Sequence, residues 1–190
     1  MMTGRMILLT EEESMNLTVR ALIPRLCPGA EEFRHWLVIS HQGKPDLDRS
    51  FPRKIQSWRE PGASFIVLRD NDGADCTKLK RALRDRVPET ATPVIIRLVC
   101  QELESWFLGD LDAVASAYPQ ASRHASFRTI GNRDPDSLTN ASEILTNLTG
   151  TAAKRIRAAA IAEQLDPERN RSKSFAVFMR SVRQGLANLQ

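Results

Sequence analysis

Along residues 1–117, short apolar runs alternate with stretches whose apolar positions recur every three or four residues. The short runs are rich in strand-forming residues, whereas the longer stretches have the periodicity of helices with one buried face. Regular alternation of strands and helices is typical of a mainly parallel sheet covered on both faces. The pattern therefore predicts an α/β fold with a four-stranded, Rossmann-like sheet, whose strands are expected at residues 5–10, 35–40, 65–69 and 93–99.

The intervening stretches predict helices, and the pattern changes after residue 117. Helices are expected at about 14–24, 51–58, 76–87 and 101–117. Residues 118–140 lose the apolar periodicity and are predicted to form a long polar loop or insertion. Helices are expected again at 142–148, 151–165 and 174–189. Because 190 residues suit one domain, residues 1–117 are predicted to form the α/β domain, and residues 118–190 a polar loop and helical extension packed on it.

Composition narrows the class of protein only slightly. The formal net charge of +4 and the pI near 9.2 permit nucleic-acid binding without requiring it. The longest apolar runs fall far short of the roughly 20 residues needed to cross a bilayer, and the N-terminus has no secretory-signal pattern. Cys27, Cys76 and Cys100 form no CxxC pair, which favours a reducing, cytoplasmic setting and argues against a structural zinc site.

Acidic residues follow three of the four expected strands. They are Glu11–Glu13 after the first, Asp70 and Asp72 after the third, and Glu102 and Glu104 after the fourth. The carboxyl ends of parallel strands share one edge, where such sheets bind ligands. Clustered carboxylates repel one another, and hard oxygen ligands suit Mg²⁺ or Mn²⁺, so a divalent metal site is expected there. Residues two positions apart in a helix face different ways, so at most one of Glu102 and Glu104 is expected to be a ligand. Alternatively, Glu11–Glu13 only cap the following helix.

A second group of candidate residues is basic or polar. His41 and Lys44 follow the second expected strand, at the same edge as the acids. Lys44 could bind a phosphate there, and His41 could act as a general base or a phosphate contact. Arg53 could extend a basic track for a nucleic-acid backbone, and Arg171 and Ser174 could bind phosphate at the acidic edge. Solvated loops and helix faces are the alternatives. The HQGK stretch lacks the pattern of an ATP-binding loop, so the chain is not expected to bind ATP by itself.

Five longer stretches of the sequence suggest a family: LLTEEESM, HQGKPDL, FIVLRDNDGADC, ELESWFLGD and NRSKSFAVF. In them the chain resembles a bacterial TOPRIM-like family known as domain of unknown function 4276, over nearly its whole length. A glutamate after the first strand and Asp-x-Asp after the third are also the signature of the TOPRIM fold of topoisomerases, primases and OLD-type nucleases. The resemblance implies a TOPRIM-like fold, a metal site and, because such proteins are often encoded beside ABC/SMC-type ATPases in anti-phage modules, an ATPase partner.

The resemblance also assigns residues by position. Glu11 corresponds to the TOPRIM glutamate, and Asp70 and Asp72 correspond to the two aspartates. Glu12 stands where many TOPRIM proteins have glycine, which lets the backbone come close to a ligand. A further acid helps to bind metal in related nucleases, and the candidates for its place are Glu102 and Glu104.

These observations lead to three hypotheses. The first is a Mg²⁺-dependent TOPRIM-like nuclease that hydrolyses DNA or RNA, with a metal-bound water as nucleophile. No covalent tyrosine step is expected, because the only tyrosine, Tyr118, lies in the polar segment. The second is a non-catalytic TOPRIM-fold subunit that docks a partner ATPase or nucleic acid. The third, a phosphatase-like enzyme with Asp70 as nucleophile, lacks the second lysine-and-acid arrangement that such chemistry needs.

Overall fold

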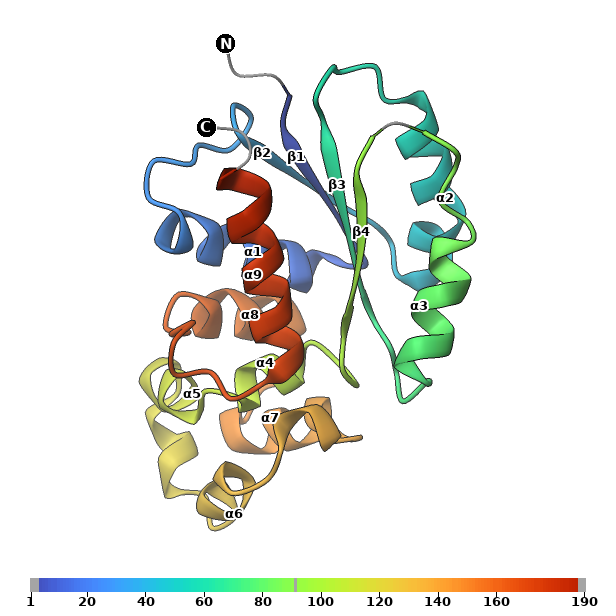
Figure 1. Cartoon of the computed structure of the whole chain (residues 1–190). Helices are drawn as coiled ribbons and strands as arrows, with labels where there is room; N and C mark the ends of the chain where they lie inside the picture. Colours follow the sequence, from blue (N-terminus) through green and yellow to red (C-terminus); the bar gives the residue numbers. More distant parts are fainter. Residues whose placement is uncertain (1–3, 91, 188–190) are drawn as a thin grey trace.

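A four-stranded parallel sheet forms the centre of the molecule (Figure 1). The computed structural model describes residues 4–90 and 92–187. The strands are β1 (Met6–Thr10), β2 (Trp36–Ser40), β3 (Ser64–Asp70) and β4 (Val94–Val99), and they lie in the order β2-β1-β3-β4. Both neighbours of β1 run parallel to it, and β4 runs parallel to β3. The predicted α/β fold with a mainly parallel sheet is confirmed.

The sheet is buried on both faces because its strands have apolar side chains on both sides. All five residues of β1 are buried. Met6 and Leu8 belong to one hydrophobic cluster, whereas Ile7 and Leu9 belong to the other. Near-continuous apolar strands of this kind are typical of parallel sheets covered by helices. The first cluster includes residues of α1 (Glu13–Leu26) and α9 (Lys173–Ala187), and the second includes residues of α2 (Lys44–Ser57) and α3 (Cys76–Arg84).

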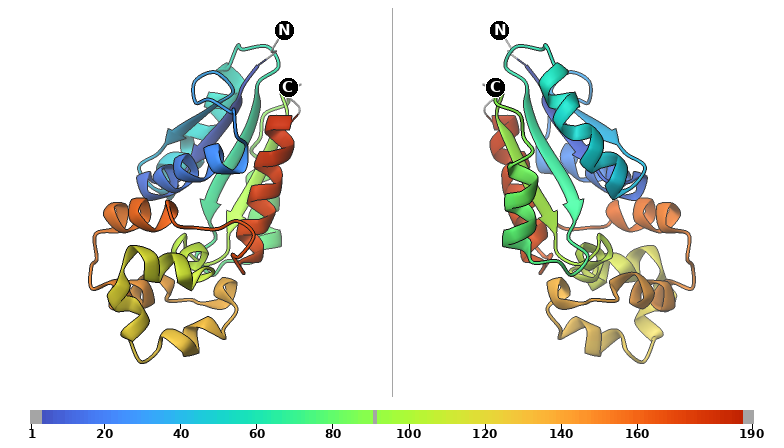
Figure 2. Two further views of the ribbon diagram at one scale, coloured as in Figure 1. Left: turned by 90° about the vertical axis from the view of Figure 1, so that its left-hand side faces the viewer. Right: turned by 90° about the vertical axis from the view of Figure 1, so that its right-hand side faces the viewer.

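Short helices gather beyond one end of the sheet (Figure 2). This helical lobe comprises α4 (Glu104–Leu108), α5 (Leu111–Ala117), α6 (Phe127–Gly131) and α7 (Ala141–Thr149), with the 3-10 helices η1 (Pro119–Arg123) and η2 (Pro135–Ser137). The strands point toward the lobe, so the carboxyl edge of the sheet faces it (Figure 2). The chain then returns through α8 (Lys154–Ala162), which packs on α1, and through α9, which packs on β4.

The polar segment at residues 118–140 is not the loop that the sequence predicts. It contains η1, α6 and η2, and three of its apolar residues, Ala121, Ile130 and Leu138, are buried in the larger cluster. The apolar positions are too widely spaced to give a helical period, yet each one anchors a short turn. Sequence periodicity therefore missed a segment that folds by packing against its neighbours.

Two other local predictions are also wrong. The helix expected at 101–117 is divided into α4 and α5, because the Asp110 side chain accepts a hydrogen bond from the N–H of Ala113 and so starts a new helix. The helix expected at 51–58 begins earlier, at Lys44 of α2, which Gly43 precedes with a φ of 87°. A positive φ suits glycine, so the chain turns sharply here. Within residues 4–90 and 92–187, no helix has the length and hydrophobicity needed to span a bilayer.

Candidate functional site

The candidate site lies between β1 and β3, where the chain changes direction across the sheet. From β1 the chain passes to β2 on one side, and β3 then pairs with β1 on the other side. In open α/β sheets, ligands bind outside the strand ends at such a switch point. Glu11 follows β1 directly and Asp70 is the last residue of β3, so both acids stand at this place.

Asp70 is buried without a full set of partners. The residue is only 8% exposed, and its Oδ1 has no hydrogen-bond partner in the described structure. Burial raises the pKa of the Asp70 carboxyl well above its usual range, and the charges of Glu11 and Glu104 raise it further. A buried charge is stable only when it is paired or neutralised. A proton or a bound cation would therefore stabilise the buried Asp70 carboxyl group.

Glu11 is held against Asp70 by the backbone. Its Oε2 accepts a hydrogen bond of 3.1 Å from the backbone N–H of Asp70, and its own carbonyl accepts one of 2.9 Å from Gly43. Burial raises the pKa of the Glu11 carboxyl, which is partly offset by the Asp70 N–H and by Lys44. The Glu11 side chain is thus held at the end of β3 and does not cap α1, whose N-cap residue is Glu12.

Asp72 lies at the outer side of the site, paired with Lys44. The two side chains form a salt bridge, and the Asp72 carboxylate is 42% exposed. Asp72 has a φ of 45°, in the left-handed region, and its N–H donates to the carbonyl of Gln101. The strand-end prediction that Lys44 lies on the acidic edge is therefore confirmed, but its direct partner is Asp72.

Glu102 and Glu104 both point toward the start of α7. Glu102 Oε2 accepts a hydrogen bond of 2.9 Å from the N–H of Ser142, and Glu104 Oε1 accepts one of 3.3 Å from its Oγ. The expectation that these two acids face different ways is wrong, because Glu102 precedes the helix, which begins at Glu104. Glu104 is also bound by Arg157, at 2.9 Å, and both side chains of this ion pair are almost fully buried.

Two cations of α8 belong to the site and were missed from the sequence. Arg157 joins Glu104 to the end of α7, while Lys154 places its Nζ 4.0 Å from Glu104 Oε1. Partial burial works against the charged ammonium of Lys154, yet its pKa is raised because Glu104, Glu12, Glu102 and Asp70 outweigh burial. A lysine at the start of a helix gives no sequence signal of this kind, since only the fold brings it to the acids.

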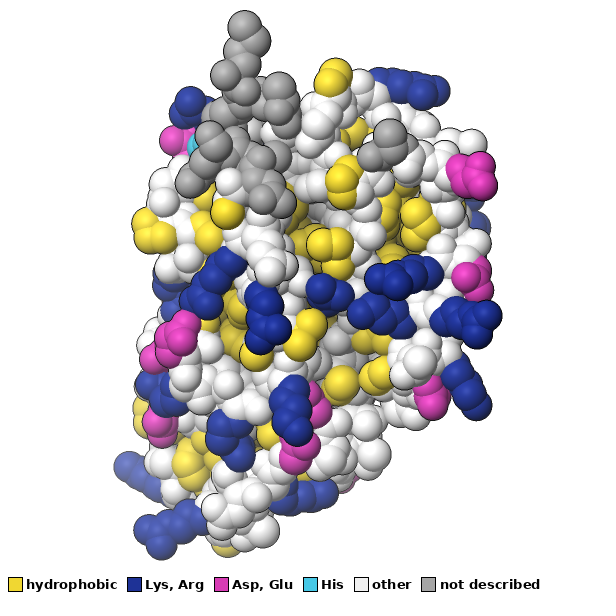
Figure 3. All heavy atoms as spheres, viewed as in Figure 1, with side chains coloured by type: hydrophobic (Ala, Val, Ile, Leu, Met, Phe, Trp, Pro, Cys, Tyr) yellow, Lys and Arg dark blue, Asp and Glu magenta, His cyan; other side chains and the backbone are white. Residues whose placement is uncertain are grey.

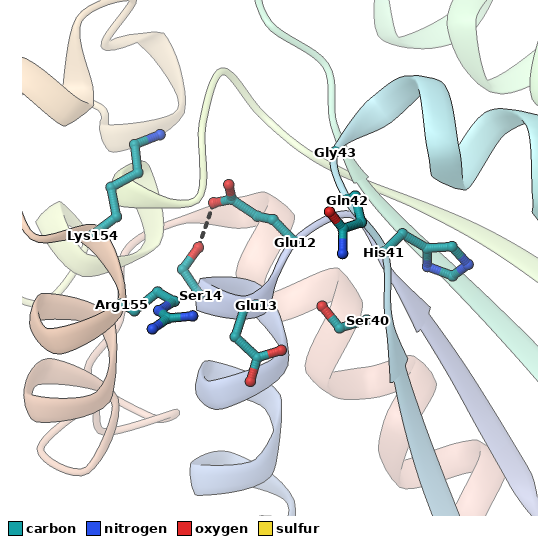
Figure 4. A pocket seen from close by; sticks show the side chains of 9 residues that line it. All are labelled: Glu12, Glu13, Ser14, Ser40, His41, Gln42, Gly43, Lys154 and Arg155. Carbon is teal, nitrogen blue, oxygen red and sulfur yellow. Dashed lines mark hydrogen bonds between the residues drawn. The ribbon is translucent and has the colours of Figure 1, made fainter.

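An open pocket of about 650 Å³ lies beside the acids (Figure 4). Its walls come from the turns after β1 and β2 and from the start of α8. Glu12 lines it together with Lys154 and Arg155, whereas Asp70 and Glu11 do not. The Glu12 carboxylate accepts a hydrogen bond from Ser14 (Figure 4). The pocket therefore offers space for a ligand next to the buried acids.

His41 is buried, and its ring is turned away from Glu12 (Figure 4). Its Nδ1 lies 2.8 Å from the carbonyl oxygen of Thr10, to which it donates. The other ring nitrogen, Nε2, is buried without a partner. Burial lowers the pKa of His41, so its neutral form is favoured. The ring supports the turn after β2, and the structure does not bring it to the acids as a base.

The remaining predicted phosphate contacts are not brought to the acids. Arg53 is exposed on α2. The guanidinium of Arg171 donates to the carbonyls of Arg133 and Leu108, in the helical lobe. Ser174 Oγ accepts a hydrogen bond of 2.9 Å from Trp106 Nε1 and donates to Asp136. The NRSKSF stretch thus joins α9 to the lobe.

The donor chemistry of the site fits a hard divalent cation, although the side chains form no finished cage. Within the described ranges, no three Asp, Glu, His or Cys side chains are grouped closely enough to hold a metal ion. The unpartnered Oδ1 of Asp70 and the adjacent Glu11 are nevertheless oxygen donors of the kind that Mg²⁺ prefers. Metal binding would use these two acids first and would require Asp72, Glu12 or Glu104 to leave its present partner.

The fold and the acids at its switch point define a TOPRIM-like α/β protein. The chain belongs to the family described as Domain of unknown function (DUF4276), whose profile matches residues 10–183. The family resemblance predicted from the sequence is thus confirmed. No curated protein matches the chain.

Two solved structures share its fold. Both are of the C-terminal region of the Xanthomonas campestris pv. campestris OLD protein, one phased with iodine and one with mercury. Each is 14% identical to this chain and matches 99% of it and 98% of the solved chain, with TM-scores of 0.56 and 0.57 respectively. At this identity the likeness shows the fold alone.

Proposed function

We propose that this protein is a TOPRIM-type phosphodiesterase that cleaves nucleic acid with Mg²⁺ or Mn²⁺ bound at Asp70 and Glu11. The observation that supports this most directly is the buried, unpartnered Oδ1 of Asp70 at the switch point of the sheet. Glu11 and Glu104 repel the Asp70 charge, and a cation would relieve that repulsion. When bound, such a metal supplies an activated water and neutralises charge on the phosphate.

The other residues of the site have distinct proposed roles. Lys154 is half-exposed between the acids and the open pocket, so its ammonium can bind a phosphate oxygen. Arg157 positions Glu104 by its buried ion pair. Lys44 and Asp72 neutralise each other in the metal-free chain, and we assign Asp72 to the metal and Lys44 to the phosphate.

The proposed substrate and partner rest on the net charge of the chain and on its family. The net charge of +4 favours a polyanionic substrate, and both DNA and RNA have the phosphodiester that the site would accept. The family resemblance adds a proposed setting, in which the chain is the effector of an ATPase-linked anti-phage module.

Cleavage and metal binding can be tested with one pair of variants. Asp70→Asn removes the charge proposed to bind the metal. Asp85→Asn makes the same change at an exposed residue that ends α3. We expect the wild type and Asp85→Asn to cleave labelled DNA or RNA with Mn²⁺ and to gain thermal stability from it, and Asp70→Asn to do neither. Equal cleavage by Asp70→Asn, or no cleavage by the wild type with its ATPase partner added, would refute the proposal.

A second candidate function is a non-catalytic binding subunit. It is favoured by the internal ion pairs, because Lys44 neutralises Asp72 and Arg157 neutralises Glu104 without any metal. In this case the acids hold a structural ion or none. Calorimetry with Mg²⁺ and Mn²⁺ separates the two functions, since the absence of binding at millimolar metal supports the binding subunit.

A further inference from the structure

The outer edge of β4 is open on a face of the molecule that the proposed nuclease site does not use. β4 is the last strand of the sheet and pairs with β3 on one side only. It lies between α3 and α9, in the middle of the view in Figure 1. Open strand edges are templates for pairing with another chain, so proteins cover or charge them.

The alternation of hydrogen bonds along β4 shows which backbone groups face outward. The carbonyls of Pro93 and Val99 accept hydrogen bonds from the N–H groups of β3 and the residue after it, Phe65 and Asn71 respectively. Backbone groups of a parallel strand face its neighbour at every second residue. The odd-numbered residues of β4 therefore face β3, and the N–H and C=O groups of the even-numbered residues face outward.

Two of these outward groups already have partners. The carbonyl of Ile96 accepts a hydrogen bond of 3.2 Å from Arg97, and the N–H of Cys100 donates to Ser174 Oγ at 3.3 Å. The outward N–H and C=O of Leu98 lie between these two positions. This donor and this acceptor can both form hydrogen bonds with the backbone of an added strand.

A depression of about 380 Å³ borders this stretch of backbone, and we call it the β4 groove. It is lined by Lys80 of α3, by Arg97 and Leu98 of β4, and by Lys173 and Val177 of α9. Val177 is 42% exposed, which is unusual among the large hydrophobic side chains of the described chain. The groove therefore combines apolar walls with three cations.

The cations of the groove are not balanced by carboxylates. Among the described residues, Lys80, Arg97 and Lys173 form no salt bridge, in contrast with the paired arginines elsewhere. Burial lowers the pKa of Lys80, and the neighbouring charges of Arg97 and Arg84 lower it further. Figure 3 shows Lys and Arg side chains gathered across the middle of this face, around hydrophobic side chains. The one acid lining the groove, Asp136, accepts hydrogen bonds from the start of α9.

We propose that the β4 groove binds an extended acidic segment of a partner protein, which adds to β4 as a further strand. Its backbone would pair with the outward groups of Leu98, its acidic side chains would meet the cations, and its apolar side chains would contact Val177. Lone anions or nucleic acid would balance the charge but would leave the backbone groups and the apolar walls without partners. A second copy of the chain is disfavoured, because two basic edges repel each other.

Binding can be measured with a fluorescent peptide in which Glu-Glu and Val-Val pairs alternate, so that an added strand carries acids on both of its faces, toward α3 and toward α9. Lys80→Glu and Lys173→Glu reverse charges in the groove, and Lys78→Glu makes the same change at an exposed position of α3 outside it. Both groove variants should fold, since one relieves repulsion between cations and the other places an acid at a helix N-terminus. We expect each groove variant to weaken binding about threefold to tenfold, and Lys78→Glu to change it less than about twofold.

The same assay tests whether the backbone takes part. A peptide that is N-methylated at alternate residues keeps its charges but cannot pair as a strand, so it should not bind. Amide hydrogen exchange of the outward N–H of Leu98 should slow when the unmodified peptide binds. Equal binding of the N-methylated peptide would overturn the proposal. Displacement of the peptide by single-stranded oligothymidine, with the same loss in the groove variants, would assign the groove to nucleic acid instead.

Discussion

Two buried aspartates, Asp70 and Asp110, have opposite surroundings. Asp110 is 2% exposed and accepts hydrogen bonds from Arg169 Nε at 2.7 Å and Nη2 at 3.0 Å, and from two backbone N–H groups. Asp70 is 8% exposed, yet its Oδ1 has no partner and its charged neighbours include Glu11 and Glu104. The two residues have the same chemistry and similar burial, and they differ in what the chain provides around them.

This difference separates a structural acid from a candidate ligand. The partners of Asp110 join the start of α5 to the turn before α9, so its charge is fully used within the fold. Asp70 is placed among other acids and left with a free oxygen, which stabilises nothing in the chain alone. Buried charges without partners are costly, and they are therefore a stronger sign of an external ligand than acidity itself.

The largest expected effect is on cleavage. Asp70→Asn should lower the Mn²⁺-dependent cleavage rate by about a thousandfold or more, because a metal contributes several kcal/mol to stabilising the transition state. Asp110→Asn should keep the wild-type rate per folded molecule. Single-turnover cleavage, normalised by the folded fraction from circular dichroism, measures both. A similar loss in the two variants would show that the comparison does not separate function from structure.

The second effect is on stability and has the reverse order. Asp110→Asn should lower the free energy of unfolding by about 2 kcal/mol, because it weakens several charge-assisted hydrogen bonds at once. The loss should stay below that of a fully buried ion pair, since the Arg169 side chain is 43% exposed. Urea unfolding measures it. An unchanged midpoint would mean that Asp110 is not a structural acid.

The sequence predicts most of the sheet because its strands are buried on both faces. Apolar runs such as the one in β3 need no tertiary information to be recognised, and the four strands lie within a residue of their expected bounds. The helical lobe could not be predicted in this way. Its short turns depend on single contacts, such as the cap that Asp110 provides for α5, and these leave no periodic signal.

Part of the candidate site is also predictable, because it depends on where the strands end. Strand ends place Glu11, Asp70 and Lys44 on one edge, whatever the details of the loops. Lys154 and Arg157 could not be predicted, because they reach the edge only when α8 packs on α1. Residues from both sides of the predicted boundary at residue 117 thus meet at the candidate site.

A third, smaller effect concerns the stability of the metal-free protein. Asp70→Asn should raise the free energy of unfolding by about 1 kcal/mol without divalent metal, because it removes repulsion from Glu11 and Glu104. Added Mn²⁺ should stabilise the wild type and leave the variant unchanged. Thermal unfolding with and without Mn²⁺ tests this. A destabilised variant would indicate that Asp70, like Asp110, already has its partners within the chain.

The smallest effect comes from a buried polar atom that is not charged. His41 Nε2 also has no partner, but burial keeps the ring neutral by lowering its pKa, against the raising influence of the hydrogen bond to the Thr10 carbonyl. Because the folded pKa lies below the unfolded value of about 6.5, the unfolded chain binds the proton more readily. Stability should therefore fall as the pH drops through 6.5 toward the folded pKa. His41→Asn, which can still donate to the Thr10 carbonyl, should lose this slope, as measured by urea unfolding at several pH values. Mn²⁺ should leave the slope unchanged, since the ring faces away from Glu12 (Figure 4) and is held by the Thr10 carbonyl. If Mn²⁺ abolished this slope, His41 would lie beside the bound cation. Any buried atom without a partner, charged or neutral, would then indicate the metal site.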